Sequence, residues 1–210
     1  MPHWITLPKL SEYEKTLAFM HSYVEEIIVG TKDESIILTE HSDVYTAGSS
    51  YKDAELINAG DIPVIYTGRG GKFTYHGPGQ RVIYPLIDLN KGNRVKDIKH
   101  YVRNLEQWII NSLYLLGVTA FTINGSVGIW VSDPSGNRAK IGAIGIRVKK
   151  WVTYHGIAVN IHTDLSKYQG IIPCGINNFS VTSLEKIGVK ISLNDFDIIL
   201  KQEFKKIFNE

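Results

Sequence analysis

The most informative part of this 210-residue chain is TGRGGKFTYHGPGQRVIYPLIDL, residues 67–89. Two glycine-dense turns, at 68–71 and 77–80, flank Thr74-Tyr75-His76, and a long apolar run follows them. Each glycine costs conformational entropy on folding, so a packed core does not favour so many glycines so close together. They are useful where the backbone must approach a ligand closely or adopt positive φ. The stretch therefore predicts a loop that cradles a ligand, with His76 at the site, rather than a tight turn alone.

The composition is that of an ordinary soluble globular protein. Hydrophobic residues make up 43% of the chain and charged residues 21%, so one domain spanning residues 1–210 can bury a real core. The net charge of +2 is too small to indicate nucleic acid binding. The chain has no recognisable signal peptide and no apolar run near the roughly 20 residues of a membrane span. One cysteine excludes an internal disulfide and favours a reducing compartment, so we expect a cytoplasmic protein.

Hydrophobic periodicity predicts helices at both ends and in the middle, with strands between them. Ser11 and Glu14 predict a capping box at the start of the first helix. Pro85 is expected to break or bend its strand, and residues 41–48 are expected to form a loop. The pattern predicts a mixed-sheet α/β or α+β domain. The expected helices span 11–29, 95–116 and 194–208. The expected strands span 35–39, 61–66, 81–89, 119–123, 128–131, 139–148 and 151–161, the last two forming a hairpin about Lys149-Lys150.

Two further places carry candidate chemistry. Cys174, the only cysteine, lies in the loop sequence GIIPCG at residues 170–175, which does not have the pattern of a helix face. A lone cysteine is most often a buried small hydrophobe, but the flanking proline and glycine favour a site position. Lys140 opens a strand that Gly142 and Gly145 weaken, so something other than strand formation requires those glycines. A glycine-lined slot, a lysine and a single cysteine together indicate thiol chemistry on an acyl group.

Other site chemistries fit the residues less well. The loop at 68–71 is not a dinucleotide fingerprint, because Phe73 stands where the third glycine belongs. The seven histidines show no metal-binding spacing and no cysteine pair accompanies them, so we expect no metal. A Cys/His hydrolase that uses His155 or His76 with Cys174 stays open as an alternative.

At this point the motifs resemble a known family. GRGGKFTYHGPGQRVIYPLIDL, GIWV, KIGAIGIRVKKWVTYHGIAVNI and GIIPCGI, in this order, are similar to the octanoyltransferases of lipoate biosynthesis, the lipoyl(octanoyl) transferases. The similarity runs from about residue 41 to 184, and the string R-G-G-x-x-T-Y-H-G-P-G-Q is highly specific. The resemblance implies the biotin/lipoate protein ligase catalytic-domain fold, with a large mixed β-sheet, a smaller sheet and flanking helices. It also implies transfer of an octanoyl group from acyl carrier protein to a lysine of lipoyl domains.

The resemblance assigns site residues one by one. Cys174 falls on the acyl-thioester cysteine and Lys140 on its lysine partner. Lys72-Phe73 departs from the polar residue and valine expected there, and we expect Phe73 to reshape the acyl slot. The implied acyl pocket consists of Arg69, Gly70, Gly71, Lys72, Phe73, Thr74, Tyr75, His76, Ala143, Ile144, Gly145, Gly156, Ile157 and Ala158.

The implied reaction needs no cofactor on the enzyme, because the donor's phosphopantetheine thioester is already activated. An unperturbed thiol, with a pKa of about 8.5, is only a few per cent ionised at pH 7, so we expect the Lys140 ammonium to stabilise the Cys174 thiolate. The implied partners are acyl carrier protein and the lipoyl domains of 2-oxoacid dehydrogenase complexes and the glycine cleavage H protein, bound by a monomer. Arg147, Lys149 and Lys150 form either a basic rim for these acidic partners or a solvated hairpin tip.

Two rival functions remain. An ATP-dependent lipoate or biotin protein ligase on the same fold would activate a free acid as an adenylate and would need no cysteine. A non-catalytic module would bind acyl carrier protein without forming an acyl adduct. Cys174 in the expected place, and the HGPGQ sequence at residues 76–80, favour the transferase.

Overall fold

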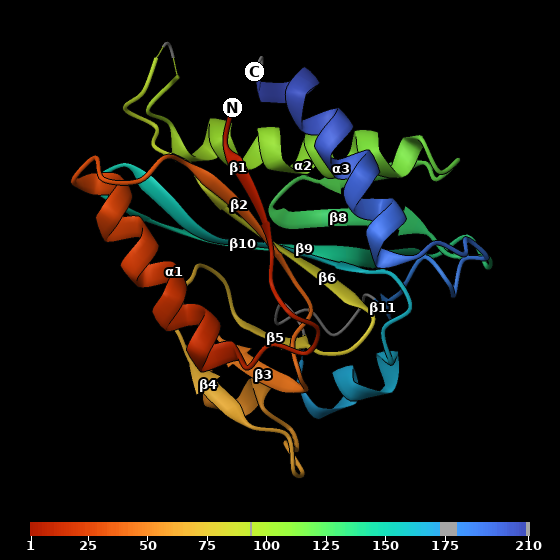
Figure 1. Ribbon diagram of the computed structural model, residues 1–210. Coiled ribbons are helices and arrows are strands. Elements are labelled where there is room, and N and C mark those ends of the chain that lie inside the picture. Colours follow the sequence, from red (N-terminus) through yellow and green to blue (C-terminus); the bar gives the residue numbers. More distant parts are fainter. Residues whose placement is uncertain (93, 173–179, 209–210) are drawn as a thin grey trace.

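The structure is a computed structural model that describes residues 1–92, 94–172 and 180–208. Within these residues the larger sheet has the strand order β1-β2-β6-β10-β9-β8-β7, and β11 pairs with β9 (Figure 1). β1 is parallel to β2 and β11 is parallel to β9, whereas the other pairs are antiparallel, so the predicted mixed sheet is confirmed. The strands are β1 (His3–Thr6), β2 (Ser35–Thr39), β6 (Gln80–Leu86), β7 (Ala120–Ile123), β8 (Ser126–Ser132), β9 (Arg138–Lys149), β10 (Val152–Asn160) and β11 (Ser180–Val181).

The smaller sheet contains two strands that the sequence did not predict, at residues 44–47 and 73–76. Its order is β4-β3-β5, formed by β3 (Val44–Ala47), β4 (Val64–Tyr66) and β5 (Phe73–His76). The expectation of a loop at 41–48 was wrong, because β3 lies in the middle of this sheet and all four of its residues are buried. A four-residue strand buried on both faces has no alternation of polar and apolar residues by which to recognise it. Of two 3₁₀ turns, η1 (Asp53–Glu55) lies between β3 and β4 in sequence, and η2 (Leu165–Gly170) follows β10.

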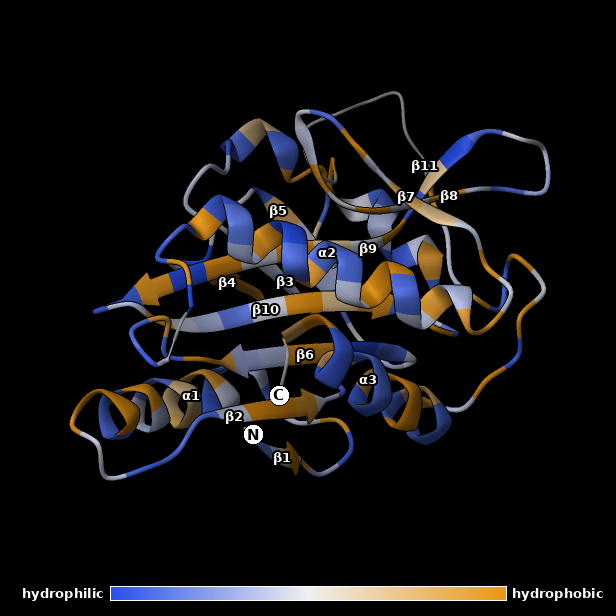
Figure 2. Cartoon of the chain, turned by 90° about the horizontal axis from the view of Figure 1, so that it is seen from above, coloured by the Kyte–Doolittle hydropathy of each residue, from blue (hydrophilic) through white to orange (hydrophobic). Residues whose placement is uncertain are grey.

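The two faces of the larger sheet are covered differently. Helices α2 (Ile98–Tyr114) and α3 (Leu193–Phe208) run over one face, while α1 (Tyr13–Ile28) and the smaller sheet lie on the other (Figure 1). Seen from above, α2 lies across the sheet beside α3, and strands β10, β6, β2 and β1 follow one another (Figure 2). Among the described residues, no helix has the length and apolar character needed to cross a bilayer.

The three predicted helices are confirmed to within a few residues, but the predicted capping box is wrong. Glu12, not Ser11, precedes the first helical turn of α1, and it makes no side-chain capping bond. The hydroxyl of Ser11 donates instead to the carbonyl of Pro8 at 2.6 Å. The backbone N–H of Ser11 donates to Glu40 at 2.9 Å, so Ser11 is held by the end of the sheet before the helix begins.

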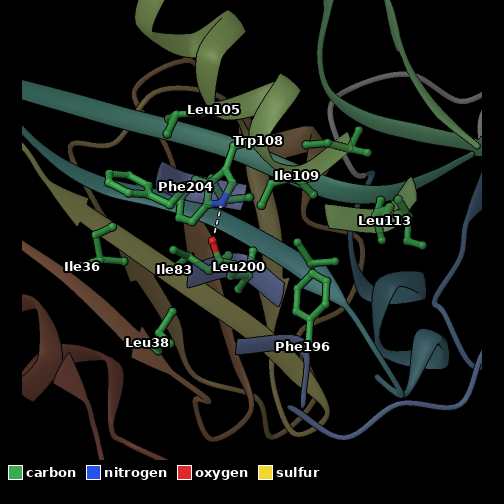
Figure 3. Packing of buried hydrophobic residues seen from close by; sticks show 14 of the residues in the cluster. Ile36, Leu38, Ile83, Leu105, Trp108, Ile109, Leu113, Phe196, Leu200 and Phe204 are labelled. Atoms are coloured by element: carbon green, nitrogen blue, oxygen red, sulfur yellow. Dashed lines mark hydrogen bonds between the residues drawn. The ribbon is translucent and has the colours of Figure 1, made fainter. Parts of the chain in front are cut away.

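The main core lies between the larger sheet and the helices α2 and α3. Trp108 of α2 is completely buried, and its indole N–H donates to the carbonyl of Leu200 in α3 at 2.9 Å (Figure 3). The ring of Phe204 meets Trp108 edge-on, with centroids 5.1 Å apart. Below them, Ile36 of β2 and Ile83 of β6 are also completely buried. Trp108 therefore ties both helices to the sheet.

The sequence suggested that Pro85 breaks or bends its own strand, but the strand is not broken there. β6 continues through Pro85, which pairs with Ile36 of β2 on one side. On the other side, the register that sets Ile157 opposite Ile83 places His155 opposite Pro85. Since proline has no N–H to donate, the ladder is interrupted there, and His155 has a φ of +57°. The distortion therefore lies in β10, beside the proline.

We predict that Trp108→Ala lowers the free energy of unfolding by about 3–5 kcal/mol, because it removes a fully buried ring and leaves a cavity between three elements. Urea unfolding followed by circular dichroism measures the change. Tyr114→Ala is the control, since Tyr114 lies on the same helix with 72% of its surface exposed. It should change stability by no more than about 0.5 kcal/mol. Equal losses in both variants would contradict this account of the core.

Candidate active site

A cavity of about 290 Å³ lies between the two sheets and collects most of the predicted pocket residues. β5 and the glycine loop before it form one wall, and β9 and β10 form the opposite wall. Such a cavity is close to the smallest that natural ligand sites offer, which suits a narrow ligand. The predicted residues that line it are Arg69, Gly71, Lys72, Phe73, Thr74, His76, Lys140, Ala143, Ile144, Gly145, Gly156, Ile157 and Ala158.

Two predicted pocket residues, Gly70 and Tyr75, are not among those that line the cavity. The N–H of Gly70 donates to the carbonyl of Ile146 at 3.0 Å, which fastens the glycine loop to β9. Tyr75 packs against Tyr45 in the core of the smaller sheet, and its hydroxyl donates to Asp43. Gly70 thus holds the glycine loop in place without lining the cavity, and Tyr75 supports β5 from the core of the smaller sheet.

Arg69 holds the glycine loop in shape. Arg69 is buried, and one terminal nitrogen donates to the carbonyl and hydroxyl oxygens of Thr46 at 2.6 and 2.8 Å. The same nitrogen donates to the carbonyl of Lys72 at 2.8 Å, and the other terminal nitrogen donates to Gly70 at 2.9 Å. The guanidinium therefore joins the loop to β3 while it also borders the cavity.

Position 145 requires glycine for a steric reason. A Cβ atom there would lie 2.6 Å from the carbonyl oxygen of Gly70, well inside van der Waals contact. Gly71 is required for a different reason, since its φ of +87° is a conformation that side chains disfavour. The glycine at position 145, which weakens β9 as a strand, thus allows the glycine loop to lie directly on it.

Lys140 lies in a socket formed by the start of β8. Its ammonium donates to the carbonyl of Val127 at 2.9 Å and lies 4.9 Å from the centre of the Trp130 ring. Gly128 has a φ of +130°, and a Cβ atom there would lie 2.5 Å from Cε of Lys140. The N–H of Gly128 donates to the buried carboxylate of Glu106 in α2 at 3.0 Å. Cys174, the predicted partner of Lys140, lies outside the described residues.

Three histidines are buried around the cavity, and burial lowers the pKa of each. The pKa of His41 falls to about 4 and that of His155 to about 3, while that of His76 lies well below its usual range. His76 Nδ1 is hydrogen-bonded to Gln80 at 2.6 Å, and its ring stacks on Tyr13. All three rings are therefore neutral at physiological pH. The described residues contain no group of three or more His, Asp or Glu side chains arranged to hold a metal ion.

Sequence reasoning missed several lining residues because they come singly from distant elements. Tyr13 is the first residue of α1, and its helical spacing indicated only a core position. His155 was considered only as a partner of Cys174. Its φ is positive, and the strand register places it opposite Pro85, a neighbour that the sequence around His155 does not reveal. The missed lining residues are Tyr13, Ser50, Val82, Tyr84, Gly125, Ser126, Val127 and His155.

The three basic residues of the predicted rim have different surroundings. Arg147 lies over the glycine loop, because a Cβ atom at Gly68 would overlap its guanidinium. Lys149 forms an ion pair with Glu25 of α1. Lys149 pairs with Val152, so the hairpin turn is Lys150 and Trp151 rather than Lys149-Lys150.

The fold places the chain in a known structural class. Lipoate-protein ligase A bound with ATP superposes with a TM-score of 0.78 at 18% identity, covering 99% of this chain and 85% of that one. A bi-partite lipoate protein ligase from Thermoplasma acidophilum gives a TM-score of 0.78 at 18% identity, and the match covers 100% of this chain and 84% of that one. Biotin protein ligase from Aquifex aeolicus, in complex with biotin and ATP, gives a TM-score of 0.60 at 10% identity. The match covers 100% of this chain and 71% of that one. The predicted lipoate and biotin protein ligase catalytic fold is confirmed.

Sequence comparison narrows the class to a family. The Lipoyl protein ligase A/B catalytic domain matches residues 12–205. The octanoyltransferases of Rickettsia felis and Rickettsia conorii are each 57% identical over 208 residues, covering 99% of this chain and 100% of each relative. The chain belongs to the lipoyl protein ligase A/B catalytic domain family, as the resemblance had indicated.

We predict that stability falls as the pH decreases from about 6.5 towards 4. In this range the unfolded chain protonates histidines that the fold keeps neutral, so it binds more protons than the native state. Each such histidine contributes up to about 1.4 kcal/mol per pH unit. Asp197, whose pKa burial raises to about 6, acts with the opposite sign and offsets part of the slope.

Urea unfolding at pH 7.5, 6.5, 5.5 and 4.5 measures this dependence. His155→Asn should flatten the slope, because asparagine tolerates the positive φ and does not titrate. His3→Asn is the matched control, since the side chain of His3 is 68% exposed. A slope that both variants leave unchanged would show that the buried rings do not control the acid sensitivity.

Proposed function

We propose that this protein transfers an octanoyl group from acyl carrier protein to a lysine of lipoyl domains, by way of a thioester on Cys174. The observation that carries the proposal is the 57% identity to octanoyltransferases over almost the whole chain. The narrow cavity that borders Lys140 supports it. The acceptor domains are those of 2-oxoacid dehydrogenase complexes and the glycine cleavage H protein, and the enzyme works as a cytoplasmic monomer.

In the proposed first half-reaction the Cys174 thiolate attacks the thioester carbonyl of the donor. The bond from the carbonyl carbon to the carrier sulfur breaks, the carrier thiolate takes a proton from the Lys140 ammonium, and octanoyl-Cys174 remains. In the second half-reaction the acceptor amine attacks octanoyl-Cys174 and loses a proton to the neutral Lys140 amine. The amide forms and the thiolate returns. No ATP is consumed, because the donor is already a thioester.

The surroundings of Lys140 suit both of its proposed roles. Lys140 is buried, and its ammonium is held by the carbonyl of Val127 and the face of Trp130, so we propose that it acts on a nearby thiolate through a medium of low dielectric constant. In this proposal, acylation of Cys174 removes the negative charge that stabilises the ammonium, so its proton can pass to the carrier thiolate. One lysine can therefore be an acid in the first step and a base in the second.

The cavity suits an unbranched acyl chain. Its walls at β9 and β10 carry Ala143, Gly145, Gly156 and Ala158, which leave a slot between the sheets. Because similar folds are found in ligases that bind ATP, an ATP-dependent ligase is the rival to test. Exchange of radioactive pyrophosphate into ATP in the presence of free lipoate would identify the ligase, and its absence together with thioester-dependent transfer would identify the transferase.

We predict that incubation with octanoyl-acyl carrier protein, without an acceptor, adds the mass of one octanoyl group to the protein. Intact mass spectrometry detects the adduct, and peptide mapping should place it on Cys174. Cys174→Ala should lose both the adduct and transfer to a lipoyl domain, since no other thiol is present. Undiminished transfer by this variant would exclude the covalent route.

We further predict that Lys140→Ala slows alkylation of Cys174 by iodoacetamide at pH 7 much more than at pH 9. Loss of the cation leaves a larger fraction of the thiol protonated at neutral pH, whereas at pH 9 most of it ionises in either protein. Lys186→Ala, a change at an exposed residue that does not line the cavity, is the control. A rate ratio between wild type and Lys140→Ala that stays constant across this range would argue that the two groups do not interact.

A further inference from the structure

The peptide between Val127 and Gly128 in β8 has a charged side chain on each of its two sides. Its carbonyl accepts a hydrogen bond from the Lys140 ammonium at 2.9 Å, and its N–H donates to the carboxylate of Glu106 at 3.0 Å. The cavity lies between the two sheets, whereas α2, which carries Glu106, covers the other face of the larger sheet (Figure 1). This one peptide therefore connects the cavity to a carboxylate on the far side of the sheet.

The two charges are close enough to attract each other through the peptide. The peptide and its two hydrogen bonds span at most about 8 Å between the carboxylate oxygen of Glu106 and the ammonium nitrogen of Lys140. The N–H points to the negative group and the carbonyl points to the positive group, so the peptide dipole is aligned with both charges. Both residues are buried, and such an alignment is stronger there than in water.

The strand ladder does not hold this peptide in place. β8 shifts register against β7 between Ser126 and Trp130, and it shifts against β9 between Ile129 and Trp130. Gly128 lies within the irregular part, and its φ of +130° belongs to a region that glycine alone enters readily. Glycine is also the residue least restricted to one conformation. The N–H of Gly128 is bound by Glu106 instead, and this hydrogen bond fixes the orientation of the peptide.

The contact between the peptide and Lys140 leaves no spare room. A Cβ atom at position 128 would lie 2.5 Å from Cε of Lys140 and 3.0 Å from its Nζ. Val127 is 53% exposed, so packing of its side chain contributes little to holding the turn. A rotation of the peptide would therefore move its carbonyl away from the ammonium, and the bond to Glu106 opposes that rotation.

Glu106 occupies a position where an apolar residue would be the simpler choice. Its neighbours Leu105, Trp108 and Ile109 in α2 are completely buried and apolar. In the part of the chain that the structure describes, the Glu106 carboxylate forms no ion pair and accepts no hydrogen bond except that of Gly128. Burial of a carboxylate is unfavourable unless its surroundings compensate for it. A carboxylate at this position therefore indicates a role at β8.

We propose that Glu106 is a positioning residue for the acyl transfer. It holds the Val127–Gly128 peptide so that the peptide carbonyl keeps the Lys140 ammonium in its place. This proposal rests on the proposed function, in which Lys140 stabilises the Cys174 thiolate and exchanges protons with the substrates. Glu106 does not line the cavity, so it acts through the peptide and not on the acyl group.

The test compares Glu106→Met with Glu106→Gln. Methionine has nearly the length of glutamate but offers no strong acceptor, whereas glutamine keeps an acceptor oxygen and loses only the charge. Glu106→Met should lower kcat for octanoyl transfer about tenfold or more. It should change KM for octanoyl-acyl carrier protein by less than about twofold, because the donor is bound elsewhere. Glu106→Gln should keep kcat within about threefold of the wild type.

Alkylation of Cys174 by iodoacetamide gives a second readout, which a loss of stability alone would not change. Glu106→Met should slow alkylation at pH 7 in the same direction as Lys140→Ala but by a smaller factor, because a displaced ammonium stabilises the thiolate less. At pH 9 its rate should approach that of the wild type. The other titratable side chains that line the cavity are the same in all these variants, namely Tyr13, Arg69, Lys72, His76, Tyr84 and His155.

Glu203→Met is the matched control. Glu203 is also a buried glutamate on a helix, but its carboxylate binds Lys206 at 2.6 Å and does not line the cavity. This variant should leave kcat and the alkylation ratio unchanged, even where it lowers the melting temperature. Thermal unfolding followed by circular dichroism sets an assay temperature at which each variant is folded. If Glu106→Met does not fold, a tenfold loss of kcat in Glu106→Gln would still contradict the proposal, since glutamine keeps the acceptor.

The outcomes separate this proposal from the function on which it rests. If Lys140→Ala changes the pH dependence of alkylation while Glu106→Met changes neither that dependence nor kcat, the role of Glu106 is overturned and the proposed function stands. Equal losses in Glu106→Met and Glu203→Met would also overturn the role of Glu106, because they would reflect a general effect on stability. If the wild type forms no octanoyl adduct and transfers nothing from the thioester donor, the proposed function fails and this proposal fails with it.

Discussion

The arrangement of the site depends on the direct contact between the glycine loop at 68–71 and strand β9. The N–H of Gly70 donates to Ile146, and the carbonyl of Gly70 lies where a side chain at position 145 would have to be. This contact brings the smaller sheet against the larger one, and the cavity is the space left between them. A side chain at position 145 would separate the two sheets. Arg69 completes the arrangement from the other side, because it binds the same loop to β3.

Lys140 borders this cavity, and its charge has neighbours on two sides. Its ammonium is bound by a carbonyl and lies over an aromatic face, and the backbone that supplies the carbonyl is itself held by Glu106. These contacts suit a group that must keep its place through a reaction cycle.

Six strands of the larger sheet and the three helices were predictable from local patterns, whereas β1 and β11 were not, and the pocket residues followed from the family resemblance. Helical periodicity located α1, α2 and α3, and the glycine-rich motifs located the loop and β9. The capping box at Ser11 failed because the end of the sheet holds that residue, which a sequence pattern does not reveal. The prediction of a loop at β3 failed because a short strand buried on both faces has no alternation of polar and apolar residues. The prediction for Cys174 concerns a residue outside the described part of the chain.

The sequence by itself determined the family, the mixed sheet and the residues of the cavity walls, because these depend on residue types at fixed spacing along short segments. Only the tertiary structure decided which single residues from distant elements complete the lining of the cavity. Tyr13, Tyr84 and His155 come from three elements, and the register places His155, with its positive φ, opposite Pro85 of the neighbouring strand. Glu106 and Gly128 likewise meet only when α2 packs on β8. Contacts between distant segments leave no periodic trace in either segment alone, so they become visible only when the chain is folded.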